Sequence, residues 1–455
     1  MWSELVGLGG RDMFLPQSRR IVERHSVYNL ARPGFWQKAI HTCTILINAS
    51  MYILVARALQ PQAFGTYLFV QWLAGIAVPA IGAGTAMLAS RQIAEVQSRE
   101  APRQVAGIFY FFWYRQHRRI LFYSLIYLLL ALPLSQMFPW CTPVLLLLAG
   151  LSTLPLLLSN VAGTTLRGLR RADLLTMLNL FGALLTLLLV IIATQVAGEP
   201  VEAFLLASAL ANTLTLILAV VCVIRLLPLD KALQPGIFLK ERLTSSLKHS
   251  WLLFALDAII WQRGELVLLA YWSGQANVGY YALASMISTV LIGLAPQLFS
   301  SWVLPLVLRY VPGHHYSDAY DAFVKTSCYI VLLAVPICMI LIILCPVLIT
   351  FCMGTMYLPL IQPLRILLIA SVFGSIATVS LTHLAHVKQK GLQTWLNAGV
   401  ACSKVVLALP LVLFWGTSGA ATVSALAQIA SSLIAILMCR HILKRREAVS
   451  AKGRS

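Results

Sequence analysis

Six charged side chains lie inside long apolar stretches of this sequence. A charge at the centre of a membrane-spanning helix costs about 2.5–3.5 kcal/mol on insertion scales, so each one needs a partner, a ligand or an ion. The cations suit an anionic headgroup, and the acids suit a coupling ion, H⁺ or Na⁺. The candidate headgroup contacts are Arg263, Lys404, Arg365 and Arg57, and the candidate ion-coupling residues are Asp257 and Glu265.

Pairing among these charges is the simpler alternative. At about 100° per helical residue, Asp257 and Glu265 lie about 80° apart, whereas Arg263 lies about 200° from Glu265. At least one charge of this segment therefore needs a partner on another helix, such as Lys404 or Arg365. Structural pairing, contact with a headgroup and binding of an ion all stay open from the sequence.

The segments that carry these residues are predicted to span a membrane. The chain is 59% hydrophobic and only 11% charged, whereas soluble domains contain about 25% charged residues. Apolar stretches of about 20 residues, the length that crosses a bilayer, recur along the sequence. The predicted spans are 38–58, 66–90, 119–138, 141–163, 174–197, 202–226, 249–272, 280–308, 326–351, 359–386, 392–415 and 418–440.

The distribution of Lys and Arg predicts the orientation of these spans. Of the 34 Lys and Arg residues, 30 lie in the terminal segments and in every second connection. Basic residues collect on the cytoplasmic side of a membrane protein, so both termini are expected in the cytoplasm. The excess of positive charge is therefore a topology signal, and no nucleic-acid partner is expected. The connections without any Lys or Arg lie around residues 60, 140, 199, 276, 355 and 417.

Two sequence matches indicate that the chain contains a repeat. The segment QPQAFGTY, with Gly65, matches GQANVGYY, with Gly279, at an offset of 214 positions. A second match, TMLNLFGA from Thr176 and TWLNAGVA from Thr394, has an offset of 218. Six spans per half make the repeats parallel. We expect the repeated glycines to serve tight turns, and the tyrosines after them to lie in the membrane interface.

The sequence thus predicts an all-α polytopic membrane protein with twelve transmembrane helices, in two parallel six-helix repeats around a central cavity. Membrane lipids are expected to surround it. No metal site is expected, since Cys338, Cys345 and Cys352 fit helix packing better than a metal or disulfide framework. The predicted parts are a basic cytoplasmic preamble 1–37, bundles 38–226 and 249–440, a cytoplasmic linker 227–248 and a basic cytoplasmic tail 441–455.

Several of these motifs resemble those of a known family. ARALQPQAFGTY, GQANVGYYALASMI and the segment 335–370, which contains Gly354 and Tyr357, resemble the Wzx-type oligosaccharide flippases. These flippases export O-antigen or exopolysaccharide repeat units and belong to the multidrug/oligosaccharidyl-lipid/polysaccharide (MOP) exporter superfamily. Gln60 departs from the pattern, which often has glycine there. The similarity runs from about residue 36 to 440 in short, degenerate motifs.

The resemblance implies a function without enzymatic activity or a cofactor. It implies alternating-access transport of a polyprenyl-pyrophosphate-linked oligosaccharide from the inner to the outer leaflet of the bacterial cytoplasmic (inner) membrane. A polysaccharide polymerase and chain-length proteins are the implied protein partners. Two alternatives stay open: an exporter of drug-like cations by ion antiport, and a membrane polysaccharide polymerase. The short outward connections argue against the polymerase, and the net positive set of charges argues against the exporter of cations.

Overall fold

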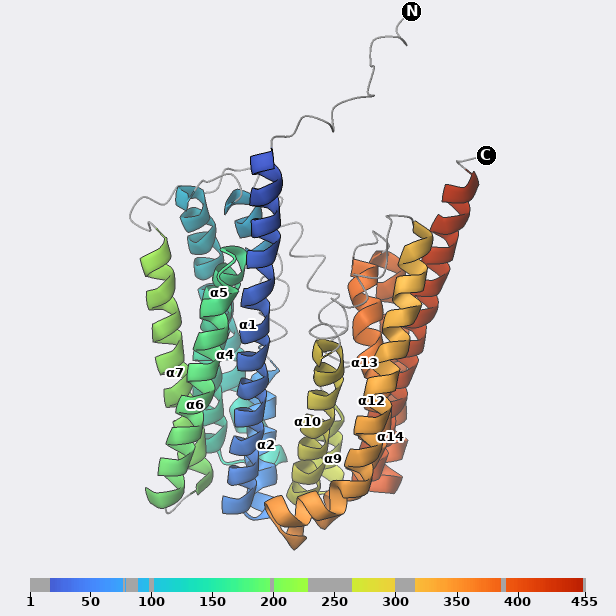
Figure 1. The fold of residues 1–455 in the computed structure, drawn as a ribbon. Coiled ribbons are helices and arrows are strands. Elements are labelled where there is room, and N and C mark those ends of the chain that lie inside the picture. The colour runs from blue at the N-terminus through green and yellow to red at the C-terminus, as the bar shows by residue number, and fades with distance from the viewer. Residues whose placement is uncertain are drawn as a thin grey trace, which may run out of the picture.

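The computed structural model describes residues 17–76, 78, 89–97, 102–196, 200–227, 264–298, 316–385 and 390–452, and all regular structure in these residues is helical (Figure 1). The first group of helices is α1 (Gln17–Ala58), α2 (Pro61–Gly75), α4 (Pro102–Met137), α5 (Pro143–Gly168), α6 (Ala172–Val196) and α7 (Pro200–Leu226). The second group is α9 (Glu265–Trp272), α10 (Gln275–Leu298), α12 (Tyr316–Met353), the short 3₁₀ helix η3 (Thr355–Leu360), α13 (Ile361–Ala385) and α14 (Lys390–Lys452).

Proline and glycine set many of the helix ends. The helices α2, α4, α5 and α7 each begin at a proline, which tolerates the first helical position because the N–H there has no helical acceptor. In the second group, the connections at Gly274, Gly354 and Gly416 each contain a glycine with positive φ, at 81°, 95° and 54°. Only glycine adopts that conformation without a steric cost, so it suits tight reversals between helices.

The helix α14 contains two predicted spans joined by a sharp reversal. A straight helix of 63 residues would be about 95 Å long, three times the thickness of a hydrocarbon core. At Gly416 the backbone leaves the helical conformation, with ψ at −125°. Beyond it, Gly419 returns so close to Leu411 that an added Cβ would lie 1.8 Å from the Leu411 carbonyl oxygen. The segments 392–415 and 418–440 therefore form a helical hairpin.

The membrane-spanning character predicted from the sequence is confirmed. Among the described residues, eight helices are long and apolar enough to cross a membrane. The count of twelve stays a prediction, because parts of the spans 66–90, 249–272 and 280–308 lie outside the described residues. The predicted linker 227–248 lies almost wholly outside them as well, and the division into the five predicted parts stays a prediction.

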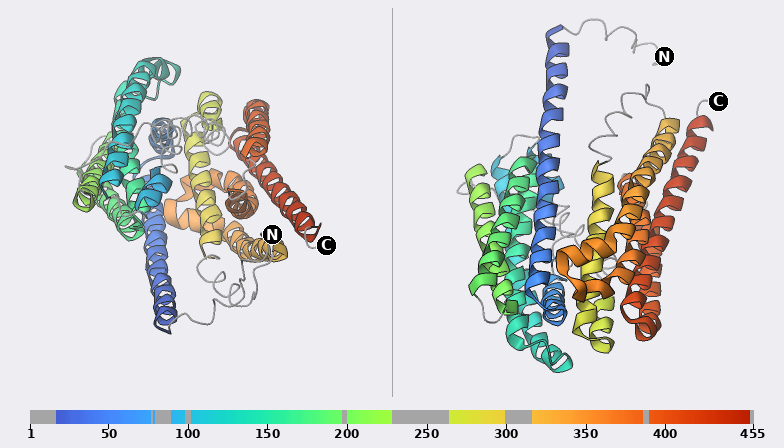
Figure 2. Two further views of the ribbon diagram at one scale, coloured as in Figure 1. Left: turned by 90° about the horizontal axis from the view of Figure 1, so that it is seen from above. Right: turned by 60° about the horizontal axis from the view of Figure 1, so that its bottom comes forward.

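The two groups of helices meet at one end of the molecule. Helices α1 to α7 lie on one side and α9 to α14 on the other. They converge at the bottom of Figure 1 and diverge toward the end where α1 begins and α14 ends (Figures 1 and 2). The bottom end holds the connections near residues 60, 140, 276, 355 and 417, which carry no Lys or Arg. We call it the outer end, following the charge distribution.

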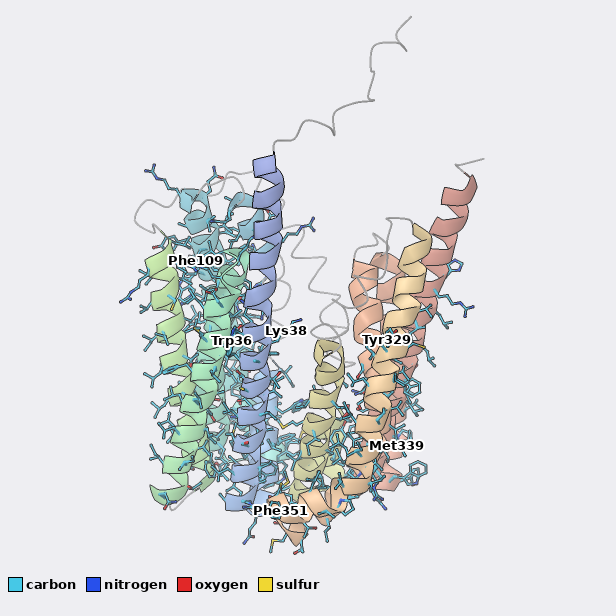
Figure 3. All side chains as sticks on the ribbon, in the orientation of Figure 1. Trp36, Lys38, Phe109, Tyr329, Met339 and Phe351 are labelled. Atoms are coloured by element: carbon cyan, nitrogen blue, oxygen red, sulfur yellow. The ribbon has the colours of Figure 1, made fainter. Side chains whose placement is uncertain are left out.

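The main hydrophobic core lies at this junction and contains residues of both groups. Phe64, Tyr67, Tyr281 and Tyr357 are among its largest side chains, and each is at most 2% exposed. Phe351 lies at the same end, whereas Phe109 lies on the first group toward the opposite end (Figure 3). Phe109 belongs to a separate core cluster within the first group.

Helix α4 extends the predicted third span toward its amino-terminal side. The span was predicted to begin at residue 119, but residues 102–118 continue the same helix. The buried residues of this added part pack against other helices of the first group, such as α5 and α7. Gln116 Nε2 donates a hydrogen bond of 3.3 Å to the carbonyl of Leu157. Leu157 lies near the middle of α5, so the basic segment 115–119 runs beside α5 within the bundle.

Candidate functional site

Two of the intramembrane charges form a buried ion pair in the second group. Lys404 Nζ of α14 lies 3.0 Å from Glu265 Oε2 at the first residue of α9, and the two side chains are 4% and 1% exposed. This contact confirms the prediction that a charge of the seventh span finds its partner on another helix. Because burial removes both groups from water, each depends on the other for neutralisation.

Two hydroxyl groups complete the surroundings of the Glu265 carboxylate. Tyr281 of α10 and Ser424 of α14 both donate hydrogen bonds to Oε1. The two hydroxyl oxygens lie 2.9 Å from each other. Lys404 and Ser424 come from opposite arms of the α14 hairpin, so the reversal at Gly416 is what brings both to one carboxylate. Glu265, Lys404, Tyr281 and Ser424 are called the buried tetrad below.

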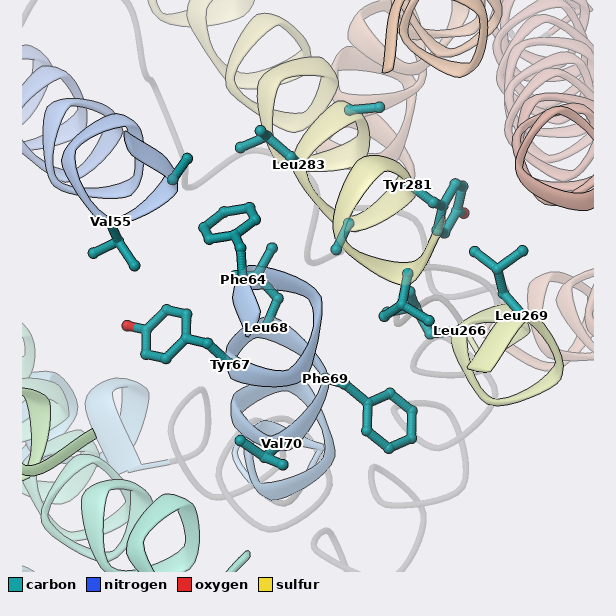
Figure 4. Close-up of a cluster of buried hydrophobic side chains, with 14 of the residues drawn as sticks. Val55, Phe64, Tyr67, Leu68, Phe69, Val70, Leu266, Leu269, Tyr281 and Leu283 are labelled. Atoms are coloured by element: carbon teal, nitrogen blue, oxygen red, sulfur yellow. The ribbon is translucent and has the colours of Figure 1, made fainter. Parts of the chain in front are cut away.

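Among its described residues, the first half contains a related arrangement without ions. Tyr67 matches Tyr281 at the repeat offset of 214, and Ser208 matches Ser424 at an offset of 216. Both tyrosines are fully buried and point away from the contact between α2 and α10, toward their own groups (Figure 4). The Tyr67 hydroxyl faces Ser208 and Tyr52. The halves therefore share the tyrosine and serine, and only the second adds Glu265 and Lys404.

The repeated glycines lie at the crossing of α2 and α10. A Cβ added to Gly65 would lie 1.9 Å from the Gln275 carbonyl oxygen, and one added to Gly279 would lie 3.1 Å from Gly65 Cα. Each glycine thus packs against the other half at the position that matches it in the repeat. The expectation that these glycines serve turns was wrong: both lie inside helices, and the turn uses Gly274 instead.

The expectation that the neighbouring tyrosines lie in the membrane interface was also wrong. Tyr67 and Tyr281 are both fully buried in the core at the junction. Each tyrosine lies two residues after the glycine at the helix crossing, and its ring points back into its own group of helices (Figure 4). Both tyrosine rings therefore pack against helices of their own half, and neither contacts lipid headgroups.

Arg57 links the first group to the second at the outer end. Its side chain is exposed, and its Nε and Nη2 donate hydrogen bonds to the carbonyl oxygens of Cys352 and Phe351. These carbonyls belong to the last turn of α12, where helical acceptors have no N–H partner and a cation is favourable. In this conformation Arg57 thus caps a helix of the other half.

Tyr357 makes the reciprocal link. From η3 its hydroxyl donates to the carbonyl oxygens of Ala56 and Leu59, at 2.8 and 3.2 Å, at the carboxyl end of α1. Its ring packs edge-on against Phe64, with 6.0 Å between ring centroids. Each half therefore caps a helix end of the other.

We expect Tyr357→Phe to lower the free energy of unfolding by about 1–2 kcal/mol, because buried carbonyls lose their donor while ring packing is kept. Denaturation of the purified protein in detergent measures this. Tyr271→Phe is the control, since Tyr271 is exposed and its variant should leave stability unchanged. Equal stability of the two variants would show that the hydroxyl contributes nothing.

The remaining candidate residues are placed as follows. Arg365 lies on an exposed face of α13. Asp257 and Arg263 lie outside the described residues, and the structure places neither. The roles of Arg263, Lys404, Arg365 and Arg57 as headgroup contacts, and of Asp257 and Glu265 as ion-coupling residues, stay predictions.

Neither Tyr281 nor Ser424 was among the site residues predicted from the sequence. Serine and tyrosine are common in membrane helices, and a serine hydroxyl usually bonds a carbonyl of its own helix, so neither residue type is a signal by itself. The repeat could have identified them, because the same pair recurs at Tyr67 and Ser208.

Solved structures of transporters share the fold of this chain. Lipid II flippase MurJ, in an inward closed conformation, aligns with a TM-score of 0.65 at 15% identity over 89% of this chain and 87% of that one. An inward-facing multidrug resistance MATE family transporter of the MOP superfamily aligns at 0.66 and 16% identity, over 91% and 99%. A MOP superfamily transporter from Pyrococcus furiosus aligns at 0.56 and 12%, over 92% and 95%.

Sequence comparison identifies the family. A search of curated proteins finds no match. The sequence profile of the family described as "Polysaccharide biosynthesis protein" matches residues 30–311, which is more than half of the chain. This match agrees with the fold and with the motifs around Gly65 and Gly279. The chain therefore belongs to the polysaccharide biosynthesis protein family and is a multi-pass membrane protein that shares the fold of these transporters.

Proposed function

We propose that this protein moves a polyprenyl-pyrophosphate-linked oligosaccharide from the inner to the outer leaflet of the bacterial cytoplasmic membrane, for cell-surface polysaccharide biosynthesis. The family match over residues 30–311 carries this proposal. A sugar hydroxyl that enters hydrocarbon without a partner costs about 4–8 kcal/mol, so the oligosaccharide cannot cross a bilayer unaided. Both termini are proposed to lie in the cytoplasm.

The contacts at the outer end support a state that is closed toward the outside. Arg57 and Tyr357 cap helix ends of the opposite halves, and Gly65 lies against Gly279. The helices diverge toward the other end (Figures 1 and 2). In the proposed cycle, an anionic lipid-linked substrate enters from the cytoplasmic side, and release requires these outer contacts to break.

The proposed headgroup contacts are the cations outside the basic connections. Arg263, Arg365 and Arg57 would attract the pyrophosphate. Lys404 would contribute only after separating from Glu265, since in this conformation its charge is neutralised at 3.0 Å. A polysaccharide polymerase and chain-length proteins would use the product on the outer side.

The fold shared with a MATE transporter keeps export of small cations as a second candidate function. The excess of cations over acids among the six intramembrane charges disfavours it. The polymerase alternative is disfavoured too, because the connections at the outer end, such as the turns at Gly274 and Gly416, leave no room for an external site.

Reconstituted transport tests the proposal. Proteoliposomes containing the purified protein and a lipid-linked oligosaccharide would be exposed to a membrane-impermeant glycosidase. We expect more oligosaccharide to become cleavable with the protein than in protein-free vesicles. In cells, deletion of the gene should remove surface polysaccharide and leave lipid-linked intermediates on the inner leaflet. Unchanged surface polysaccharide together with increased drug sensitivity would favour the export of small cations instead.

A further inference from the structure

The buried tetrad has the composition of a site for a small monovalent cation. Such ions are held by oxygen atoms, and Glu265, Tyr281 and Ser424 supply a carboxylate and two hydroxyls within mutual contact. The place of the ion is taken by the ammonium group of Lys404, 3.0 Å from Glu265 Oε2. Among the described residues Oε2 has no hydroxyl or amide donor.

From this geometry we infer that Lys404 is a tethered cation, which fills a monovalent-cation site formed by Glu265, Tyr281 and Ser424. Glu265 then binds no coupling ion while the pair is intact. If transport is coupled to an ion gradient, the coupling acid is elsewhere, and Asp257 is the remaining candidate. The inference rests on the tetrad itself, and only its consequence for coupling depends on the proposed function.

The comparison between the halves shows that the ion pair is not needed to pack this helix junction. In the first half, Tyr67 and Ser208 occupy the positions that match Tyr281 and Ser424. Tyr52, which lies near Tyr67, precedes Glu265 by 213 positions and so lies within one residue of the position that matches it. Both tyrosines are fully buried, so the junction of the first half excludes water from its tyrosine without an ion pair among the described residues. The acid and its cation are therefore an addition in the second half.

Replacing the tethered cation should expose the site to free ions. Methionine is one heavy atom shorter than lysine, so Lys404→Met vacates the position of Nζ while its apolar stem stays. The described titratable groups that face Glu265 are Lys404 of α14 and Tyr281 of α10. Among the described residues no other cation faces Glu265, so in the variant we expect a proton or Na⁺ to neutralise it in place of the ammonium.

Thermal unfolding of the purified protein in detergent tests this without any substrate. We expect the Tm of Lys404→Met to be lower than that of the natural protein by on the order of 5 °C. Exchange of N-methylglucamine for Na⁺ at constant ionic strength, or a decrease of pH from 8 to 6, should restore most of the loss, since an ion bound only by the folded state stabilises it. The Na⁺ series and the pH series distinguish which ion enters.

Two controls make the result specific. The natural protein should not respond to Na⁺, and the double variant Glu265→Gln, Lys404→Met should respond to neither Na⁺ nor pH. The inference is overturned if Lys404→Met responds to neither ion, if the double variant responds like the single one, or if Na⁺ stabilises the natural protein in a way that Glu265→Gln abolishes. Failure to transport the oligosaccharide would contradict the proposed function and leave this result unaffected.

Discussion

Gly65→Ala is expected to reduce transport by about fivefold or more. The added Cβ would lie 1.9 Å from the Gln275 carbonyl oxygen, so α2 and α10 must move apart by more than 1 Å to restore an ordinary contact of about 3.5 Å. Overpacking of this kind costs about 1–3 kcal/mol. Because the contact joins the two halves at the outer end, the cost falls on the state that is closed there.

A cost of this size shifts the equilibrium between two conformations by about 5–150-fold. The proteoliposome assay measures the loss of transport. The shift itself is measured with a cysteine introduced at Thr66, which is 5% exposed, in a background without the native cysteines. Gly65→Ala should increase the labelling of this cysteine by a membrane-impermeant maleimide added from outside.

Gly75→Ala is the matched control. It is the last residue of the same helix, and among the described residues its added Cβ meets no atom within 4 Å. We expect transport and labelling close to those of the natural protein. If both alanine variants behave alike, close approach of α2 to α10 is not what the repeated glycine provides.

Glu265→Leu is expected to destabilise the protein by about 3–5 kcal/mol, because it removes one partner of a buried ion pair and leaves the other charge in place. The Lys404 side chain is 4% exposed, so water cannot replace the carboxylate at low cost. Adding Lys404→Met should recover most of the loss, since replacing a whole buried pair by apolar residues is often neutral. Denaturation in detergent, analysed as a double-mutant cycle, measures both effects.

Glu202→Leu provides the comparison for this cycle. Glu202 also lies in the first turn of its helix, α7, but it is only half-buried. Its substitution is expected to cost less than about 1 kcal/mol. Equal costs for the two glutamates would show that helix position, and not the buried pair, determines the effect. A double variant as unstable as Glu265→Leu alone would contradict the role of pairing.

The sequence predicted the membrane-spanning character of these helices, because apolar length is a direct consequence of bilayer physics. It also predicted that a charge near Glu265 would find a partner on another helix. It could not choose between Lys404 and Arg365, because helical periodicity fixes the faces of one helix and says nothing about which neighbour packs against it.

The expectation that the repeated glycines serve turns was wrong for a similar reason. A glycine that adopts positive φ, like Gly274, and one that lets two helices touch, like Gly65, look the same in a sequence. Only the position of Gly65 five residues into α2 distinguishes them. The third span was predicted to begin at residue 119, yet residues 102–118 continue the same helix, α4, and Gln116 lies beside α5.

The meeting of Gly65 with Gly279 also bears on the ancestry of the chain. A residue that touches its own counterpart across a pseudo-twofold axis is what two identical subunits of a dimer would show. A precursor with a single copy of the repeated segment would have associated through this one glycine with a second copy of itself before the gene duplicated and fused. The acid and the lysine of the second half would then be later acquisitions, made once the two halves were free to diverge.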